Sequence, residues 1–258
     1  MNSRIVQIAI NTFREAVRDR VLYNLIAFAL LMSAAAVVLG QISIQIERPL
    51  VINLGLTAVS LFGLVIAIFI GTGLVAKEID KRTLYTVLSR PVGRWEFMAG
   101  KFFGLAATLV VNTFFMALGV FAALGYVSHH FERSDVWVLV ALYFIVLQFV
   151  LTTALALLFS SFSSAVFSAV VTFWLFVIGS FAGDLRTFAG TAHGLTRWLA
   201  TAAAYLVPNF AALNVISQVA HGEAVAPRLV LLNTAYVLVY ALAVGSAAVL
   251  IFDRRNLK

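Results

Sequence analysis

The residues that most often carry chemistry are few in this chain. Its 258 residues include four histidines and no cysteine, so disulfides, thiolate metal sites and cysteine nucleophiles are excluded. No Ser-His-Asp arrangement, pair of catalytic carboxylates or His-Glu-x-x-His zinc motif can be assembled from the sequence. We therefore expect no catalytic residue and no enzymatic activity in this chain.

The histidines are the remaining candidates for a metal site. His129 and His130 are near Glu132 in the sequence, and Asp184 is the acidic residue before His193. Their spacings, like that of the fourth histidine, His221, match no ligand motif. We expect no resident metal ion, and an external metal site remains an alternative.

A phosphate-binding loop is also missing. Gly100-Lys101 resembles the end of a Walker A motif, but Trp95 stands where the first glycine belongs. Phe102 follows the lysine in place of the required Ser or Thr. This chain is therefore not expected to bind a nucleotide itself.

The composition places these residues in a membrane protein. Hydrophobic residues make up 62% of the chain and charged residues 11%, whereas a soluble domain has roughly 25% charged residues. A spanning helix needs about 20 apolar residues, and Ser160–Ser164 reads as a turn that divides the longest apolar window. We predict an all-α integral membrane protein, a single domain over 1–258 with six spans at about 21–42, 51–75, 102–127, 136–159, 164–183 and 229–252.

A long external helical loop is expected before the last span, at 184–228. Residues 195–220 are apolar, but Pro208-Asn209 interrupts them and the second half is more polar. We interpret this segment as two short helices at one membrane face, either re-entrant or lying on the surface.

The basic residues sort to one side of the predicted spans. The two termini and the loop between spans 2 and 3 together account for the whole net charge of +7. The positive-inside rule therefore places them in the cytoplasm of a multi-pass protein of a bacterial inner membrane, and leaves nothing to favour nucleic-acid binding. Residues 4–20 form an amphipathic interfacial helix, serving either as a topology anchor or as an elbow helix beside a cytoplasmic partner.

The cytoplasmic loop at 78–97 carries the most information. Glu78 precedes Arg82 by four residues, the favourable order for an ion pair within a helix. Leu84, Val87 and Leu88 share one face, and Pro91 ends the helix. The pattern predicts a short amphipathic helix over 78–91, whose apolar face requires either lipid or a partner protein.

This loop resembles the signature of the ABC-transporter type-2 (exporter-type) permeases. The resemblance is carried, in order, by Lys77-Glu78, Thr83-Leu84-Tyr85, Leu88-Ser89-Arg90-Pro91-Val92-Gly93-Arg94-Trp95-Glu96-Phe97 and Gly100-Lys101. Arg82 departs from the pattern, because many members have glycine there. The opening Asn11-Thr12-Phe13-Arg14-Glu15 is similar to permeases of nitrous-oxide reductase maturation systems, for which copper would be the metal at an external site.

The resemblance implies that the loop is a coupling helix that fits a cleft in an ATPase subunit. The contact residues it implies are Glu78, Lys81, Arg82, Leu84, Tyr85, Leu88, Arg90 and Pro91. A second cytoplasmic contact would come from Ser161, Phe162 and Ser163. An ATPase partner is also expected on independent grounds, because the predicted spans contain no charged residue or histidine that could couple transport to an ion. ATP and Mg²⁺ are then expected in that partner, and no cofactor in this chain.

Small and polar residues within the spans are candidates for a pathway. Gly55, Val59, Gly63, Ala67 and Gly71 form an i+4 row that permits either internal packing or a dimer contact. In the resembled family, spans 2 and 5 of two permeases line the route between them. The resulting candidates for a pathway or dimer face are Thr57, Ser60, Gly63, Ser164, Ser168 and Thr172.

The sequence thus predicts the permease subunit of an ATP-driven exporter, paired with a second permease as a homodimer or heterodimer. Two alternatives stay open: a non-transporting membrane anchor or assembly factor for a cytoplasmic partner, and an ion-coupled secondary transporter. The pathway has no charged residue, which favours an apolar or lipid-like cargo over a free ion.

Overall fold

The computed structural model describes residues 2–17, 22–40, 47–80, 93–130 and 132–254. Within these ranges all regular secondary structure is helical. The helices are α1 Asn2–Ala16, α2 Leu22–Gly40, α3 Glu47–Asp80, α5 Arg94–Ser128, α6 Val136–Ser160, α7 Ala165–Ser180, α8 Ala182–Thr191, α9 Gly194–Leu206, α10 Ile216–Ala220 and α11 Pro227–Arg254. Two short 3-10 turns lie at Arg133–Asp135 and Ala211–Leu213.

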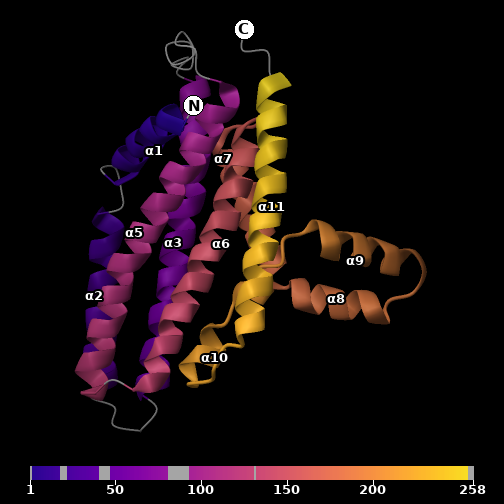
Figure 1. Ribbon diagram of the computed structural model, residues 1–258. Coiled ribbons are helices and arrows are strands. Elements are labelled where there is room, and N and C mark those ends of the chain that lie inside the picture. Colours follow the sequence, from indigo (N-terminus) through magenta and orange to yellow (C-terminus); the bar gives the residue numbers. More distant parts are fainter. Residues whose placement is uncertain (1, 18–21, 41–46, 81–92, 131, 255–258) are drawn as a thin grey trace.

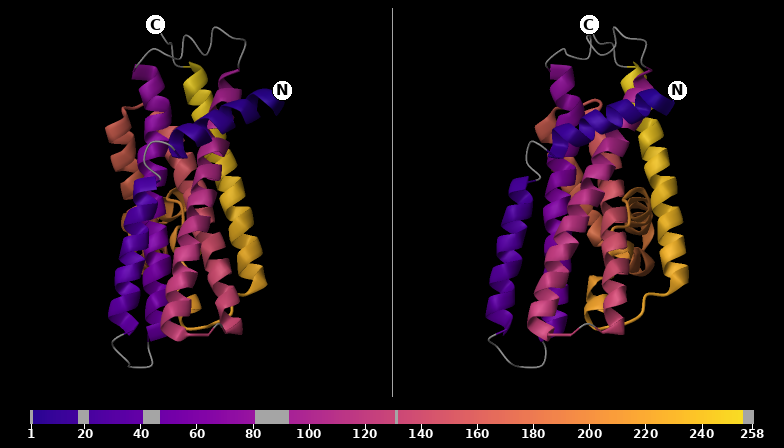
Figure 2. Two further views of the ribbon diagram at one scale, coloured as in Figure 1. Left: turned by 90° about the vertical axis from the view of Figure 1, so that its left-hand side faces the viewer. Right: turned by 60° about the vertical axis from the view of Figure 1, so that its left-hand side comes forward.

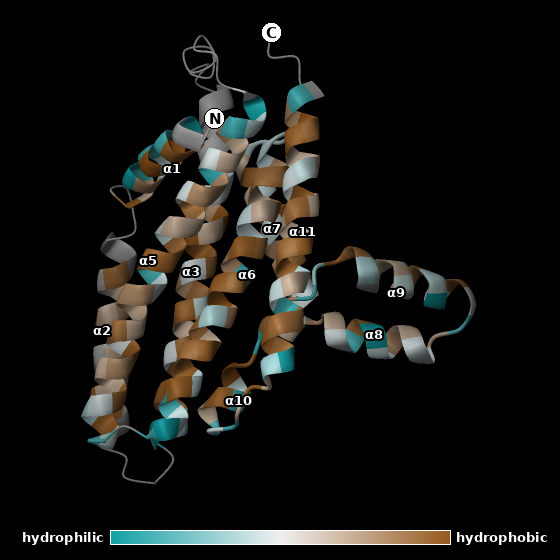
Figure 3. Cartoon of the chain, viewed as in Figure 1, coloured by the Kyte–Doolittle hydropathy of each residue, from teal (hydrophilic) through white to brown (hydrophobic). Residues whose placement is uncertain are grey.

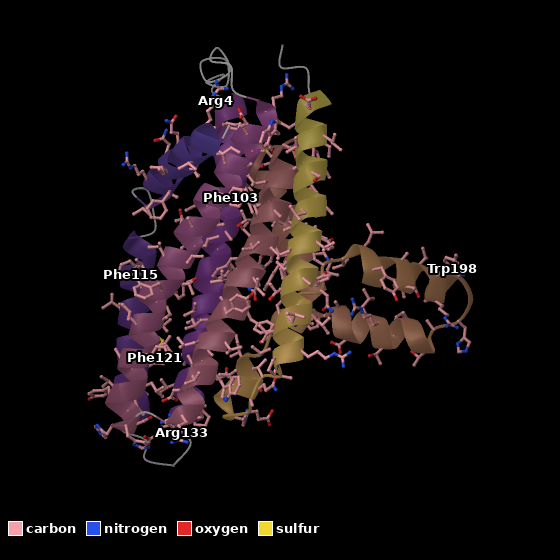
Figure 4. All side chains as sticks on the ribbon, in the orientation of Figure 1. Arg4, Phe103, Phe115, Phe121, Arg133 and Trp198 are labelled. Carbon is pink, nitrogen blue, oxygen red and sulfur yellow. The ribbon has the colours of Figure 1, made fainter. Side chains whose placement is uncertain are left out.

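The long helices run side by side as a bundle (Figures 1 and 2). We call the end that holds α1 and the last turn of α11 the terminal end, and the opposite end the distal end. Hydrophobic residues cover the long helices between these ends, as Figure 3 shows. Charged residues such as Arg4 and Arg133 lie at opposite ends (Figure 4). This distribution is that of a protein whose solvent is the lipid bilayer.

Four described helices are long and apolar enough to cross a membrane: α3, α5, α6 and α11. A fifth candidate is α7 with α8, which are bent by 60° at their junction. The apolar stretch of α2 at Ala27–Val38 is shorter. The prediction of a helical, multi-pass membrane protein is confirmed, whereas the six-span count stays a prediction.

Helix α6 forms the centre of the bundle. It packs against α3, α5, α7 and α11, and it buries Phe144, Leu151 and Thr152 completely. The side-chain amide of Gln148 donates a hydrogen bond of 2.9 Å to the hydroxyl of Ser60 on α3. This bond satisfies two polar groups that would otherwise be costly inside the membrane.

The small-residue row of α3 faces this core. A Cβ on Gly63 would collide with the ring of Phe149, and one on Gly71 would come within 3.0 Å of Ala156 Cβ. Gly55 lies against Val120 and Met32 in the same way. The structure therefore uses the row for close packing within the chain.

The region predicted as one span at 164–183 is broken. Helix α7 ends at Ser180, and the helical hairpin formed by α8 and α9 projects sideways from the bundle (Figure 1). The returning chain packs against the last turns of α7: the carbonyl oxygen of Pro208 lies directly over Gly179, and the centroid of the Phe210 ring is 5.0 Å from that of Phe176.

Candidate coupling junction and transmembrane groove

Most of the predicted coupling helix lies outside the described residues. Lys81, Arg82, Leu84, Tyr85, Leu88, Arg90 and Pro91 all fall within 81–92. Glu78 belongs to the last turn of α3, and α5 begins at Arg94. The structure thus describes the two helices between which this loop is held.

The first residues after the loop form a tightly bonded junction. Glu96 is buried, and its Oε2 accepts a hydrogen bond of 3.0 Å from the backbone N–H of Gly93, which caps α5. Arg94 reaches across to α11 and donates bonds of 2.8 Å to the carbonyl oxygens of Phe252 and Asp253. A cation at the last carbonyls of a helix is stabilised by the helix dipole.

Aromatic packing reinforces the junction. The ring of Phe97 stacks on that of Phe252 with centroids 6.1 Å apart, and the Arg94 guanidinium lies 5.9 Å from the Phe252 centroid. Both phenylalanines are buried. The start of α5 is therefore fastened to the end of α11 by hydrogen bonds, a cation–π contact and ring stacking.

The next two turns of α5 seat the amphipathic helix α1. A Cβ on Gly100 would lie 2.6 Å from Ile8, and one on Gly104 would lie 2.6 Å from both Thr12 and the carbonyl oxygen of Ala9. The pair has the spacing of a GxxxG motif, which lets two helix backbones approach closely. Helix α1 crosses α5 at this seat (Figure 2).

An ion pair accompanies the seat. Lys101 Nζ lies 3.8 Å from a carboxylate oxygen of Glu15 and 5.6 Å from the centroid of the Phe97 ring. The lysine side chain is 6% exposed, whereas that of Glu15 is 53% exposed. The stretch Gly93–Gly104 therefore binds three helices together: α5, α11 and α1.

The turn predicted as a second contact lies between α6 and α7 at the same end. The hydroxyl of Ser161 bonds the carbonyl oxygen of Leu158 at 2.7 Å, and the N–H of Ser163 bonds that of Phe159 at 3.0 Å. Phe162 is 46% exposed. The turn is hydrogen-bonded to the end of α6 and presents one large apolar side chain.

A groove of about 720 Å³ runs along α3 at this end. Its walls come from α3 and α7, with the end of α1 at its mouth. The described lining residues are Glu15, Ala16, Leu61, Leu64, Val65, Ile68, Phe69, Ile70, Thr72, Gly73, Ala165, Val166, Ala169, Val170, Phe173 and Trp174. The walls are apolar and partly aromatic, and Glu15 is the one charged residue in this set.

A second groove of about 650 Å³ continues toward the distal end, between α2, α3 and α10. Leu61 lines both grooves, so a single face of α3 is open along its length. From Leu50 to Gly73 this face covers about 35 Å at 1.5 Å per residue, the thickness of a bilayer core. Asn53, Thr57 and His221 make the distal part more polar.

The predicted pathway residues are divided by the structure. Thr57 lines the distal groove, and its hydroxyl lies 3.4 Å from Asn53 Oδ1. Ser60 and Gly63 face α6 instead, and Ser168 and Thr172 are buried in α7, where Thr172 bonds the Ser168 carbonyl. Ser164 caps α7 through the N–H of Phe167.

The groove residues that sequence reasoning missed are apolar. Leu61, Phe69, Phe173 and Trp174 give no signal in spans that are apolar on every side. In the sequence, Glu15 stands out only as part of the family resemblance at residues 11–15. Its partner Lys101 is far away in the sequence, and only the docking of α1 on α5 joins them.

The distal end is held by ionic contacts. Arg48 at the start of α3 pairs with the buried carboxylate of Asp135, and its other terminal nitrogen lies 3.4 Å from Glu132. His130 Nε2 lies 3.6 Å from the same glutamate. We call Arg48, Glu132 and Asp135 the distal clamp. Among the described residues no group of three His, Asp or Glu side chains could hold a metal ion.

Together these features define a multi-pass helical membrane protein, with an open apolar face along α3 and a bonded junction at the start of α5. Residues 6–257 match the family described as ABC-2 family transporter protein, and the chain belongs to that family. It is the membrane permease component of such a transporter, in which ATP hydrolysis takes place in a partner ATPase subunit. Comparison with curated proteins gives no significant match.

Proposed function

We propose that this chain is an exporter permease of six spans that pairs with a second permease and moves its cargo along the open face of α3. The terminal end faces the cytoplasm of a bacterial cell, where residues 78–91 form the coupling helix. A separate ATPase subunit, which binds ATP and Mg²⁺, drives the movement by pushing on this helix. The similarity of residues 11–15 to nitrous-oxide reductase maturation permeases stays a prediction.

The junction behind the loop is the observation that carries this proposal. Arg94, Phe97 and the seat at Gly100 and Gly104 tie the start of α5 to α11 and α1. A loop with no such attachment could anchor a partner but could not transmit force. Here a push on the loop would shift three helices together, which favours a transporter over a passive anchor.

The α3 groove supports the second half of the proposal. Helices α3 and α7 line it, and they correspond to the second and fifth predicted spans. Its opening lies on the surface of this chain, so a second permease would complete its wall.

The proposal is tested by substitutions that remove the apolar face of the predicted coupling helix. The chain is co-expressed with its ATPase and purified through a tag on the permease. Leu84→Asp with Leu88→Asp should abolish co-purification, because two carboxylates on the docking face would have to be buried without partners. Leu84→Met with Leu88→Met keeps the face apolar and should preserve the complex.

The outcome is read with membrane insertion as a control. Equal yields of both variants in the membrane fraction would show that folding is intact. Unchanged co-purification of the aspartate variant would refute the coupling role. For the alternatives, ATP hydrolysis by the complex that no added cargo stimulates would favour an anchor, and uptake that fails with an uncoupler but survives ATP depletion would favour a secondary transporter.

A further inference from the structure

The groove between α3 and α7 has one ionisable residue among its described lining residues, the carboxylate of Glu15. Thr72, the other polar side chain of the wall, has its hydroxyl bonded to the carbonyl oxygen of Ile68 at 2.8 Å. The remaining walls are aliphatic and aromatic. The groove therefore combines a large apolar surface with one negative group at its mouth.

Glu15 is only partly engaged by its partner. The 3.8 Å separation from Lys101 Nζ is longer than a good charged hydrogen bond, and half of the glutamate side chain is exposed. Lys101 is buried behind the seat of α1 and does not line the groove. The groove wall thus presents the carboxylate and hides the ammonium.

We propose that this groove binds an amphipathic cation, with the positive group at Glu15 and the apolar body between α3 and α7. The volume of about 720 Å³ lies within the range of small-molecule sites, which is about 300–1,000 Å³. A neutral apolar molecule would gain nothing from Glu15, and an anion would be repelled by it. This inference rests on the proposed function, because it names the class of cargo for the same groove.

The ring pair at the far wall suits such a ligand. Phe173 and Trp174 lie edge to face with centroids 6.2 Å apart, and both are about half exposed. Exposed aromatic faces can take either an apolar body or a cation passing over them. Trp174 also supplies a spectroscopic probe inside the groove.

Binding is tested on the permease alone, in phosphatidylcholine nanodiscs. Replacing Trp95, Trp137 and Trp198 by Phe leaves Trp174 as the one tryptophan. Its emission is titrated with tetraphenylphosphonium and with tetraphenylborate, a cation and an anion of matched size and shape. Bilayers dissolve the anion better, owing to their dipole potential, so a stronger effect of the cation cannot come from partitioning.

We expect a saturable change with the cation and a non-saturable one with the anion. Glu15→Gln keeps the shape of the side chain and should weaken cation binding roughly tenfold, as the loss of one partly screened charge contact predicts. Glu223→Gln removes an exposed carboxylate at the distal end and should leave binding unchanged. Ala165→Phe narrows the groove from the α7 side, leaves both charged residues in the sequence and should abolish the saturable change.

Equal titrations of the two ions, or an unaltered affinity in Glu15→Gln, would overturn the proposal. Absence of cation binding by the unaltered groove, together with a change of oligomeric state in Ala165→Phe, would also overturn it, because the groove would then be an interface for a second copy. No ATPase is present in these titrations. A negative result would therefore refute only the proposed class of ligand. The proposed function would still be tested separately by the co-purification experiment.

Discussion

Single glycines set how closely the helices of this protein approach one another. Gly63 lies beneath the Phe149 ring, whereas Gly245 on α11 has open space where a Cβ would stand. Both occupy helices in the membrane region. Replacing glycine by alanine at each of the two positions therefore distinguishes the effect of packing on stability from the effect of helix propensity.

Gly63→Ala should destabilise the protein by about 1–3 kcal/mol, because the new methyl group forces α3 and α6 apart. Gly245→Ala should be neutral or stabilising by up to about 1 kcal/mol, through its gain in helix propensity. Thermal loss of the monodisperse peak in size-exclusion chromatography measures both. Equal behaviour of the two variants would contradict the packing of α3 on α6.

At the scale of elements, the attachment of α1 is the feature with the clearest mechanical role. It holds an amphipathic helix, whose exposed surface carries Arg14, against the first turns of α5. The last residues of α1 line the groove. Movement of α5 would therefore change the mouth of the groove through α1.

Gly104→Leu should unseat α1, because its side chain would occupy the position of Thr12 and the Ala9 backbone. Tryptic cleavage after Arg14 should become several-fold faster, as expected when a local opening costs about 1 kcal/mol less. Gly190→Leu on α8 is the matched control, since nothing lies within 4 Å of its added Cβ. Unchanged cleavage in Gly104→Leu would show that α1 is held by other contacts.

The elements differ in how far sequence reasoning could reach them. The long spans were predictable because the cost of a charge in the bilayer leaves clean apolar windows. The break after Ser180 was not, since α7 and α8 are together apolar enough for one span and only the fold shows the 60° bend between them. Likewise the sequence permits either internal packing or a dimer contact at Gly63, and only the fold shows that Phe149 of α6 packs on it. In the junction, Arg94 could be recognised as part of a motif, but its role at the end of α11 required the fold.

At the scale of the whole molecule, the α8–α9 hairpin differs from a water-soluble hairpin, because its small side chains are buried and its large apolar ones are exposed. Its buried residues are the alanines at 182, 189 and 200, while its large apolar residues point outward. Leu195, Trp198 and Tyr205 are each at least 75% exposed, and Trp198 lies far from the bundle in Figure 4. A hairpin in water would bury such residues, so lipid is the expected surrounding.

A variant with Trp198 as the one tryptophan tests this placement. Lipids with brominated acyl chains should quench its emission strongly, because those chains contact the exposed indole. Acrylamide, which stays in water, should quench it weakly. The reverse pattern would place the hairpin in the aqueous phase or against another protein.

The distal clamp has a geometric consequence for any motion of the bundle. Arg48, Glu132 and Asp135 join the far tip of α3 to the connection between α5 and α6 by ion pairs. A tilt of the helices about these contacts would move the distal end least, and its amplitude would grow with distance from them. A tilt of a few degrees over about 35 Å would already displace the terminal end by about one or two ångströms. The lever arm is thus longest at the terminal end, where α1 packs on α5.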